Sequence, residues 1–188
     1  SPNVLWVGSD DGYVQVSRDA GKTWKNVTPP GIGDYARISI VEASHYQEGA
    51  AYVAANRFQL DDFSPSLWKT TDFGATWTKI VDGIAPEAWA RVVREDPVRK
   101  DLLYLGTETG FYVSFTGGQR WTKLQLNLPV TPITDLRVHQ NDLVASTGGR
   151  AFWILDDLSV LQQWTDATAT SDVRLFTPRV AYRTQAFG

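Results

Sequence analysis

Two arginines recur at matching places in the chain. Arg37 and Arg91 each follow an alanine, open an apolar stretch and come a similar distance after a tryptophan, Trp24 and Trp77. Two guanidinium groups at one site can clamp a carboxylate or a phosphate with several N–H donors. The pattern therefore predicts a binding site for an anionic group at Arg37 and Arg91. In the alternative, each arginine pairs with an acid close to it in the sequence, namely Glu42, Glu87 or Glu95.

Three acidic residues are candidates for a different chemistry. Hydrolysis of a glycosidic bond uses two carboxyl groups that lie about 5 to 9.5 Å apart. Asp61, Asp62 and Glu108 lie in polar segments between apolar ones, so they are the candidate catalytic residues. Their spacing in the sequence does not fix the distance between them. A solvated loop, or a cation bound at Asp61 and Asp62, explains the same pattern.

Trp89 and Arg150 complete the candidate ligand site. Trp89 stands just before Arg91, and with Phe58 and Phe63 it offers aromatic surface on which a sugar or a peptide can stack. The same aromatic residues could instead anchor their loops by packing. Arg150 follows two glycines, but no Lys-Ser/Thr pair or helical pattern follows, so this segment is not a phosphate-binding loop.

The composition argues against several classes of partner. The net charge of −3 at pH 7 gives no basic surface for a nucleic acid. No run of about 18 apolar residues occurs, so we expect no membrane insertion. The 188 residues include no cysteine, and His45 and His139 have no acidic neighbour at ligand spacing. We therefore predict no metal site and no cofactor.

A repeated turn indicates the elements that must hold these side chains. In its frame, a hydroxyl residue is followed by aspartate, glycine and tryptophan at fixed spacing, between two short apolar runs. Aspartate can accept bonds from backbone N–H groups about one to three residues after it, and glycine can adopt a positive φ. Tryptophan buries a large area while its N–H reaches a carbonyl. The frame predicts a structural hairpin turn, with a cation at the aspartate as the alternative. Its members are Ser17, Asp19, Gly21 and Trp24, then Thr70, Asp72, Gly74 and Trp77, then Ser114, Gly118 and Trp121, where Thr116 replaces the aspartate.

This frame resembles the Asp-box, or bacterial neuraminidase repeat (BNR), of sialidase-like and sortilin-like β-propellers. Residues 1–12, 92–97 and 152–157 are similar to segments of large bacterial sortilin-like proteins that are often labelled glycosyl hydrolases. The resemblance implies the C-terminal part of such a propeller and an extracytoplasmic location. It also implies that an arginine cluster could hold a carboxylate, as in sialidases. A sialidase would further need a tyrosine nucleophile, for which Tyr35 and Tyr46 are available.

The spacing of the box tryptophans predicts the fold. They recur at intervals of 53 and 44 residues, and four-stranded propeller blades recur at about this period. We therefore predict an all-β β-propeller of four-stranded antiparallel blades, with about four blades or part-blades in this chain. A β-sandwich has a similar strand count but no reason to repeat one turn. The expected units are residues 1–30, a partial blade of three strands; 31–83, a blade with an Asp-box; 84–128, a blade with a degenerate Asp-box; and 129–188, the last blade and the C-terminal tail.

The two end units are incompletely specified. The first has no counterpart of an innermost strand, and the last strand of the final unit could be 161–164 or 173–176. Residues 173–176 could close the ring on the first blade. Equally, the rest of the propeller or another chain could cover the open edge at 4–7, because a bare edge invites aggregation. We also expect a long loop at 56–65 and a short helix near 156–163.

Three hypotheses for function follow. In a propeller the box turns lie on one rim, and the loops that converge on the opposite face usually carry ligand sites. The first hypothesis is a non-catalytic scaffold that binds a protein or peptide in an extracytoplasmic assembly, because the architectural residues are intact and no convincing catalytic set is present. The second is a glycoside hydrolase of sialidase or xyloglucanase type acting on the loop face. The third is an architectural half-ring whose partner is the rest of its own propeller.

Overall fold

The computed structural model describes residues 2–180, and within them the strands form four antiparallel sheets. The first sheet contains β1 (Leu5–Gly8), β2 (Val14–Ser17) and β3 (Lys25–Asn26). The second contains β4 (Arg37–Ala43), β5 (Ala51–Arg57), β6 (Asp62–Thr70) and β7 (Thr78–Lys79). The third contains β8 (Ala90–Glu95), β9 (Leu103–Thr107), β10 (Phe111–Ser114) and β11 (Thr122–Lys123). The fourth contains β12 (Ile133–His139), β13 (Asp142–Thr147) and β14 (Phe152–Leu155).

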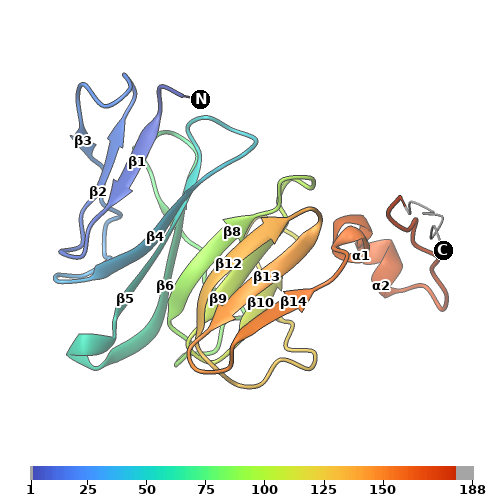
Figure 1. Ribbon diagram of the computed structural model, residues 1–188. Coiled ribbons are helices and arrows are strands. Elements are labelled where there is room, and N and C mark those ends of the chain that lie inside the picture. The colour runs from blue at the N-terminus through green and yellow to red at the C-terminus, as the bar shows by residue number, and fades with distance from the viewer. Residues whose placement is uncertain (1, 181–188) are drawn as a thin grey trace, which may run out of the picture.

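Each sheet is a meander, and the sheets radiate from a common centre. Within every sheet the spatial order of the strands is their order in the chain. Across the sheets, the first strand β8 contacts the first strands β4 and β12, and Figure 1 shows the sheets following one another like blades. This arrangement is that of successive blades of a β-propeller, so the predicted fold class is confirmed. In the first blade β1 contacts β4, and among residues 2–180 no strand pairs with the edge of β1 that faces away from β2.

The core consists of apolar clusters between neighbouring blades. Side chains alternate along β5, so Val53 and Ala55 pack toward the first blade, while Tyr52 and Ala54 pack toward the third. β9 is buried along its whole length, since both faces of the third blade are covered. Continuous apolar strands are expected wherever a sheet is covered on both sides. No helix among residues 2–180 is long and apolar enough to cross a bilayer.

The Asp-box turns close as predicted, with one correction. The Ser17 hydroxyl accepts the N–H of Gly21 at 2.8 Å, and the Asp19 carboxylate accepts the N–H and the hydroxyl of Thr23 at 2.9 and 2.6 Å. The bonded N–H is thus four residues after the aspartate, rather than within the first three. The hydroxyl bond from Thr23 is the main cause that lowers the pKa of Asp19 to about 2. The second box repeats these contacts with Thr70, Asp72, Gly74 and Thr76.

The third box forms the same turn without its aspartate. The Ser114 hydroxyl accepts the N–H of Gly118 at 3.0 Å, and the Thr116 hydroxyl accepts the N–H of Arg120 at 3.1 Å. A hydroxyl therefore replaces one of the carboxylate's bonds, which is sufficient to keep the turn geometry. The third turn makes fewer bonds than the other two.

Each box also contains a feature that we did not predict. The residue before the box glycine has a positive φ as well, at 59° for Ala20, 59° for Phe73 and 65° for Gly117. Its N–H donates to a carbonyl just ahead of β1, β5 or β9, the strand that pairs with the strand leading into the box. These carbonyls belong to Asn3, Gly49 and Asp101. This bond ties the box to the neighbouring hairpin, and it offsets the cost of a left-handed conformation at a non-glycine residue.

The chain after β14 differs from the prediction. Residues 159–163 form helix α1 (Ser159–Gln163), which lies within the stretch 156–163 where we expected a short helix. No strand therefore occupies residues 161–164. After a short helix α2 (Asp166–Ala169), residues 173–176 form no strand, and Val173 and Leu175 are almost fully exposed. Residues 173–176 therefore do not close the ring on the first blade, which was one of the two alternatives. Figure 1 shows α1 and α2 at the opposite end of the molecule from β1.

The loop within residues 56–65 is shorter than expected. β5 continues to Arg57, and β6 already begins at Asp62, with Arg57 and Asp62 paired in register. Only a turn of 3₁₀ helix, η1 (Phe58–Leu60), and Asp61 with a φ of 58° lie between them. The polar residues that suggested a loop occupy an extended hairpin, because the pairing of two strands tolerates polar side chains beyond the core.

Candidate binding site on the loop face

Arg37 and Arg91 line one cavity, as predicted. Arg37 begins β4, Arg91 is the second residue of β8, and Thr134 of β12 lies beside them. The cavity has a volume of about 240 Å³ and is also lined by Ser39 and Asn56. These residues come from the first strands of three blades and from β5, so the cavity opens where the blades meet. Only packing of the blades brings Arg37 and Arg91 to one cavity.

The two arginines differ in their electrostatic environment. The Nε and Nη2 atoms of Arg91 both lie 2.5 Å from one carboxylate oxygen of Glu108. Arg37 is exposed, and its guanidinium has no side-chain partner among residues 2–180. Neither arginine pairs with Glu42, Glu87 or Glu95, which were the acids considered as alternatives. Arg91 is thus neutralised by a different acid, whereas Arg37 retains an unpaired positive charge.

Trp89 packs behind the cavity instead of lining its surface. Only 9% of Trp89 is exposed. Its ring stacks on Phe58 at 5.2 Å between centroids and lies 5.5 Å from Phe63, while the Arg91 guanidinium lies over its face at 5.5 Å. The expectation of an exposed Trp89 is therefore wrong, and the structure favours the loop-anchor alternative. The indole Nε1 of Trp89 is buried and donates no hydrogen bond.

The candidate catalytic acids have local partners or a turn role. Asp62 forms an ion pair with Arg57 at 3.3 Å and accepts the Ser64 hydroxyl at 2.6 Å, and that hydroxyl bond is the main cause that lowers the pKa of Asp62. Asp61 ends the turn η1. Glu108 is bound to Arg91. A general acid in glycoside hydrolysis needs a raised pKa, so the environment of Asp62 does not suit that role.

Arg150 lies apart from the arginine pair. It is exposed in the turn between β13 and β14, where its N–H donates to Thr147 and its carbonyl accepts the indole N–H of Trp153 at 2.8 Å. It is not among the residues that line the cavity of Arg37 and Arg91. The structure therefore does not assemble all the predicted ligand contacts into one site.

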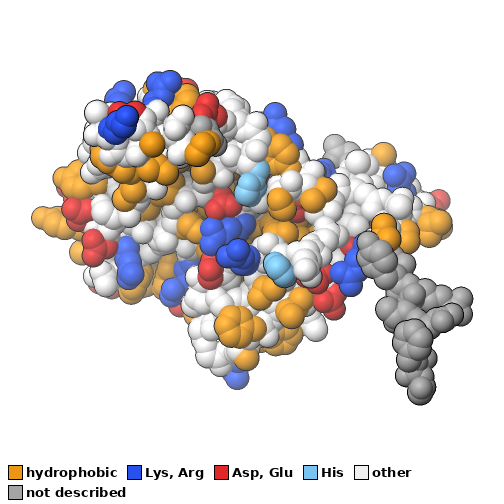
Figure 2. All heavy atoms as spheres, turned by 45° about the horizontal axis from the view of Figure 1, so that its top comes forward, with side chains coloured by type: hydrophobic (Ala, Val, Ile, Leu, Met, Phe, Trp, Pro, Cys, Tyr) orange, Lys and Arg blue, Asp and Glu red, His pale blue; other side chains and the backbone are white. Residues whose placement is uncertain are grey.

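Sequence reasoning missed Arg94, which ties three blades together. Its guanidinium lies 2.8 Å from Glu42 of β4 and 2.8 Å from Asp135 of β12, and it donates to the carbonyl of Leu136 at 2.7 Å. Burial lowers the pKa of Arg94, but the two carboxylates outweigh it and raise the pKa. Figure 2 shows basic side chains bordered by acidic ones on this side of the molecule. A charged residue within the apolar run of β8 was the available signal.

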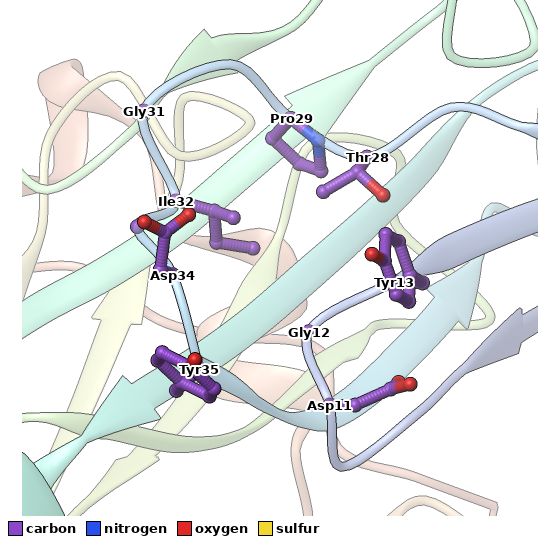
Figure 3. A pocket seen from close by; sticks show the side chains of 10 residues that line it. Asp11, Gly12, Tyr13, Thr28, Pro29, Gly31, Ile32, Asp34 and Tyr35 are labelled. Carbon is purple, nitrogen blue, oxygen red and sulfur yellow. The ribbon is translucent and has the colours of Figure 1, made fainter.

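Another cavity, with a volume of about 660 Å³, lies at the first blade and the segment that follows it. Figure 3 shows Tyr13 and Thr28 on one side of it and Asp34 and Tyr35 on the other, with Asp11 at the turn between β1 and β2. Tyr35, considered as a nucleophile, is exposed and has a φ of 57°. No acid or base is hydrogen bonded to Tyr35 among the described residues, so the site lacks the activation that a nucleophile needs.

The repeated turns and the radiating sheets of three or four strands match part of a β-propeller of the Asp-box type. No protein-family model matches the sequence. A probable oligoxyloglucan-reducing end-specific xyloglucanase of Neosartorya fischeri is 35% identical over 81 residues, which are 42% of this chain and 9% of the fungal protein. The chain therefore spans less than a tenth of that relative's length.

Solved propellers have the same fold. The structure titled YCF48 bound to D1 peptide superposes with a TM-score of 0.63 at 19% identity, covering 83% of this chain and 49% of that one. YCF48 from Cyanidioschyzon merolae gives 0.59 at 18% identity, covering 97% and 54%. The GH74 xyloglucanase from Xanthomonas campestris gives 0.63 at 20% identity, covering 83% and 26%. The chain thus spans about half of the YCF48 chains, and these likenesses concern the fold alone.

Proposed function

We propose that this chain is a non-catalytic β-propeller scaffold that binds a peptide segment of a protein partner on its loop face. The observation that carries the proposal is the unpaired guanidinium of Arg37, exposed at a cavity where three blades meet. Polar side chains of Ser39, Asn56 and Thr134 surround it. A peptide carboxylate, from an acidic side chain or a free C-terminus, would gain charge-assisted bonds from Arg37 there.

Two further observations support a binding role. Asp62 and Glu108 already pair with arginines, so the loop face offers no free carboxylate pair from the candidate set. The structure of YCF48 bound to D1 peptide shows that a propeller of this fold can bind a peptide. The proposal includes an extracytoplasmic assembly as the setting, which rests on the resemblance of the sequence to sortilin-like repeat proteins. Fractionation of source cells would test that location.

A peptide library tests the proposal. The chain would be screened against random peptides with free carboxyl termini, and affinities of selected peptides measured by fluorescence polarisation. Arg37→Ala should weaken binding about 10- to 100-fold, the effect of losing a charge-assisted bond. Arg120→Ala, an exposed arginine on the box rim, is the matched control and should leave affinity unchanged. Equal binding by Arg37→Ala, or no selected peptide, would contradict the proposal.

A second candidate is a glycoside hydrolase of xyloglucanase type. The observation that favours it is the 81-residue match to the fungal xyloglucanase. Incubation with xyloglucan oligosaccharides, followed by a reducing-end assay, distinguishes the two functions. Turnover that Asp61→Ala, Asp62→Ala or Glu108→Gln abolishes would establish hydrolysis and displace the scaffold proposal.

A further inference from the structure

The box tryptophan of one blade reaches across to the blade before it. The indole Nε1 of Trp77 donates to the carbonyl of Val27 at 2.7 Å, and that of Trp121 donates to the carbonyl of Ile80 at 2.8 Å. In both cases the acceptor is the third residue after the box tryptophan of the preceding blade, since Val27 follows Trp24 and Ile80 follows Trp77. The contact between neighbouring blades therefore follows one rule.

The box glycine obeys the same rule. A Cβ added at Gly74 would come 2.5 Å from a Val27 side-chain atom, and one added at Gly118 would come 2.5 Å from a side-chain atom of Ile80. Each glycine thus lets the preceding blade approach closely at the residue whose carbonyl accepts the indole. Two independent contacts, one polar and one steric, define where a preceding blade docks.

The first blade has the docking elements but no blade against them. Trp24 is 43% exposed, compared with 2% for Trp121, and its Nε1 donates to the carbonyl of Gly21 within its own box. A Cβ at Gly21 would meet only Leu5 and Trp24 itself, at 3.5 Å or more. The box is otherwise formed in the same way as the second one. The turn itself is therefore complete. Among the described residues, the first box lacks the contacts that the second and third boxes make with a preceding blade.

Apolar side chains continue around this position. Leu5, Val7 and Tyr13 are exposed together with Trp24, and we call these four residues the Trp24 surface. Leu5 and Val7 alternate along β1 with Trp6, which packs into the core shared with the second blade. They therefore point away from that core. Along the same blade, β1 also has a free edge.

We propose that the Trp24 surface docks one further box-bearing propeller blade. The partner blade presents the carbonyl of the third residue after its own box tryptophan to the Trp24 indole, and its side chain at that residue packs on Gly21. The interface continues the pattern of the two blade interfaces already present in the chain. This surface is separate from the peptide site at Arg37, so the proposal does not depend on the proposed function.

The last blade of a second copy is a poorer occupant. It exposes the apolar residues Phe152 and Ile154, but in the described part of the chain no strand follows β14 in its sheet. Val27 and Ile80 directly follow β3 and β7, the strands that come after the box in their blades. That blade therefore lacks the acceptor that the Trp24 indole requires.

A fusion protein tests the proposal, because it can provide a further blade copied from the chain itself. A copy of residues 31–141 would be joined ahead of Val4 of the otherwise full chain. The added copy of 84–128 is a box-bearing blade, and the added copy of β12 can pair with the free edge of β1. Hydrogen exchange of the tryptophan indole N–H groups, followed by NMR, reports on each tryptophan separately.

In the unfused chain, the Trp24 indole N–H should exchange much faster than that of Trp121. In the fusion it should slow by about tenfold or more, because a buried, bonded N–H exchanges only when the contact opens. Trp24→Phe should lower the urea midpoint of the fusion more than that of the unfused chain. Trp164→Phe, at the opposite end of the molecule, is the matched control and should lower both equally.

Three results would overturn the proposal. One is a Trp24 indole N–H that exchanges equally fast in the fusion and the unfused chain. Another is an added segment that stays unfolded beside a folded chain, because docking should order it. The third is an unfused chain with the native mass of a dimer in light scattering and a protected Trp24, which would assign the surface to a second copy.

Discussion

The box rim and the loop face are built on the same strands, yet they differ in how their contacts are specified. On the rim, the hydroxyl residue, the aspartate and the glycine bond to each other within eight consecutive residues, and the pattern recurs in successive blades. On the loop face, the cavity of Arg37 and Arg91 combines residues from β4, β5, β8 and β12. A turn made of local bonds can thus be recognised in a sequence, while the contacts within a cavity that several blades form depend on how the blades pack.

The largest effect should come from the rim. Trp121→Ala should lower the free energy of unfolding by about 3 to 5 kcal/mol, because it removes a fully buried aromatic side chain. Trp24→Ala should cost clearly less, since Trp24 is far more exposed and bonds only within its own box. Urea denaturation of both variants measures the difference. Equal losses would mean that the box tryptophans act through their own turns and not through blade contacts.

Acid should weaken the first two boxes but not the third. Bonds from threonine hydroxyls lower the folded-state pKa of Asp19 and of Asp72 to about 2, below the usual value of about 4. Stability from these groups is present above pH 4 and is lost as the pH falls toward 2, because the unfolded chain binds more protons there. Thermal melts from pH 5 to pH 2 measure this loss. The double variant Asp19→Asn, Asp72→Asn should show a flatter decline, and an unchanged decline would contradict the assignment.

Restoring the third box should give a smaller effect of opposite sign. Thr116→Asp should raise the free energy of unfolding by about 0.5 to 1 kcal/mol, because a carboxylate makes a stronger bond to the N–H of Arg120 than a hydroxyl does. Urea midpoints measure the gain, and Thr116→Val, which removes the acceptor, should be destabilised. A neutral result for both would show that this turn does not need an acceptor at position 116.

The smallest effect on stability should come from the loop face. Arg37→Ala should change the free energy of unfolding by less than about 0.5 kcal/mol, as is usual for an exposed residue without partners. Arg91→Ala should cost more, because it leaves Glu108 without its ion pair. The same urea measurements test both variants. A strongly destabilised Arg37→Ala would show that this arginine supports the fold instead of a ligand.

The fold was predictable because its signals are local and repeated. The box residues fix a turn, the apolar runs on either side fix two strands, and the period of the repeat fixes the size of a blade. The boundaries were less predictable. β6 begins at Asp62 and not within the later apolar run, and residues 173–176 form no strand. The length of a hairpin and the conformation of a C-terminal segment both depend on tertiary contacts as well as on local sequence.

The candidate site was only partly predictable. The recurrence of Arg37 and Arg91 predicted that both residues would lie at one site, because equivalent positions of successive blades face a common centre. Their different partners were not predictable, since Glu108 reaches Arg91 through the pairing of β8 with β9. The burial of Trp89 under Phe58 likewise depends on how the second blade packs against the third.

By itself, the sequence determined the class of fold, the three box turns and the strands that flank them, because these depend on residues close together in the chain. Only the tertiary structure decided which charges are neutralised, that Arg94 links three blades, and that Trp24 is exposed while Trp121 is buried. The physical reason is that burial and ion pairing depend on which blades lie side by side. Identical local motifs therefore acquire different environments at the end and in the middle of a row of blades.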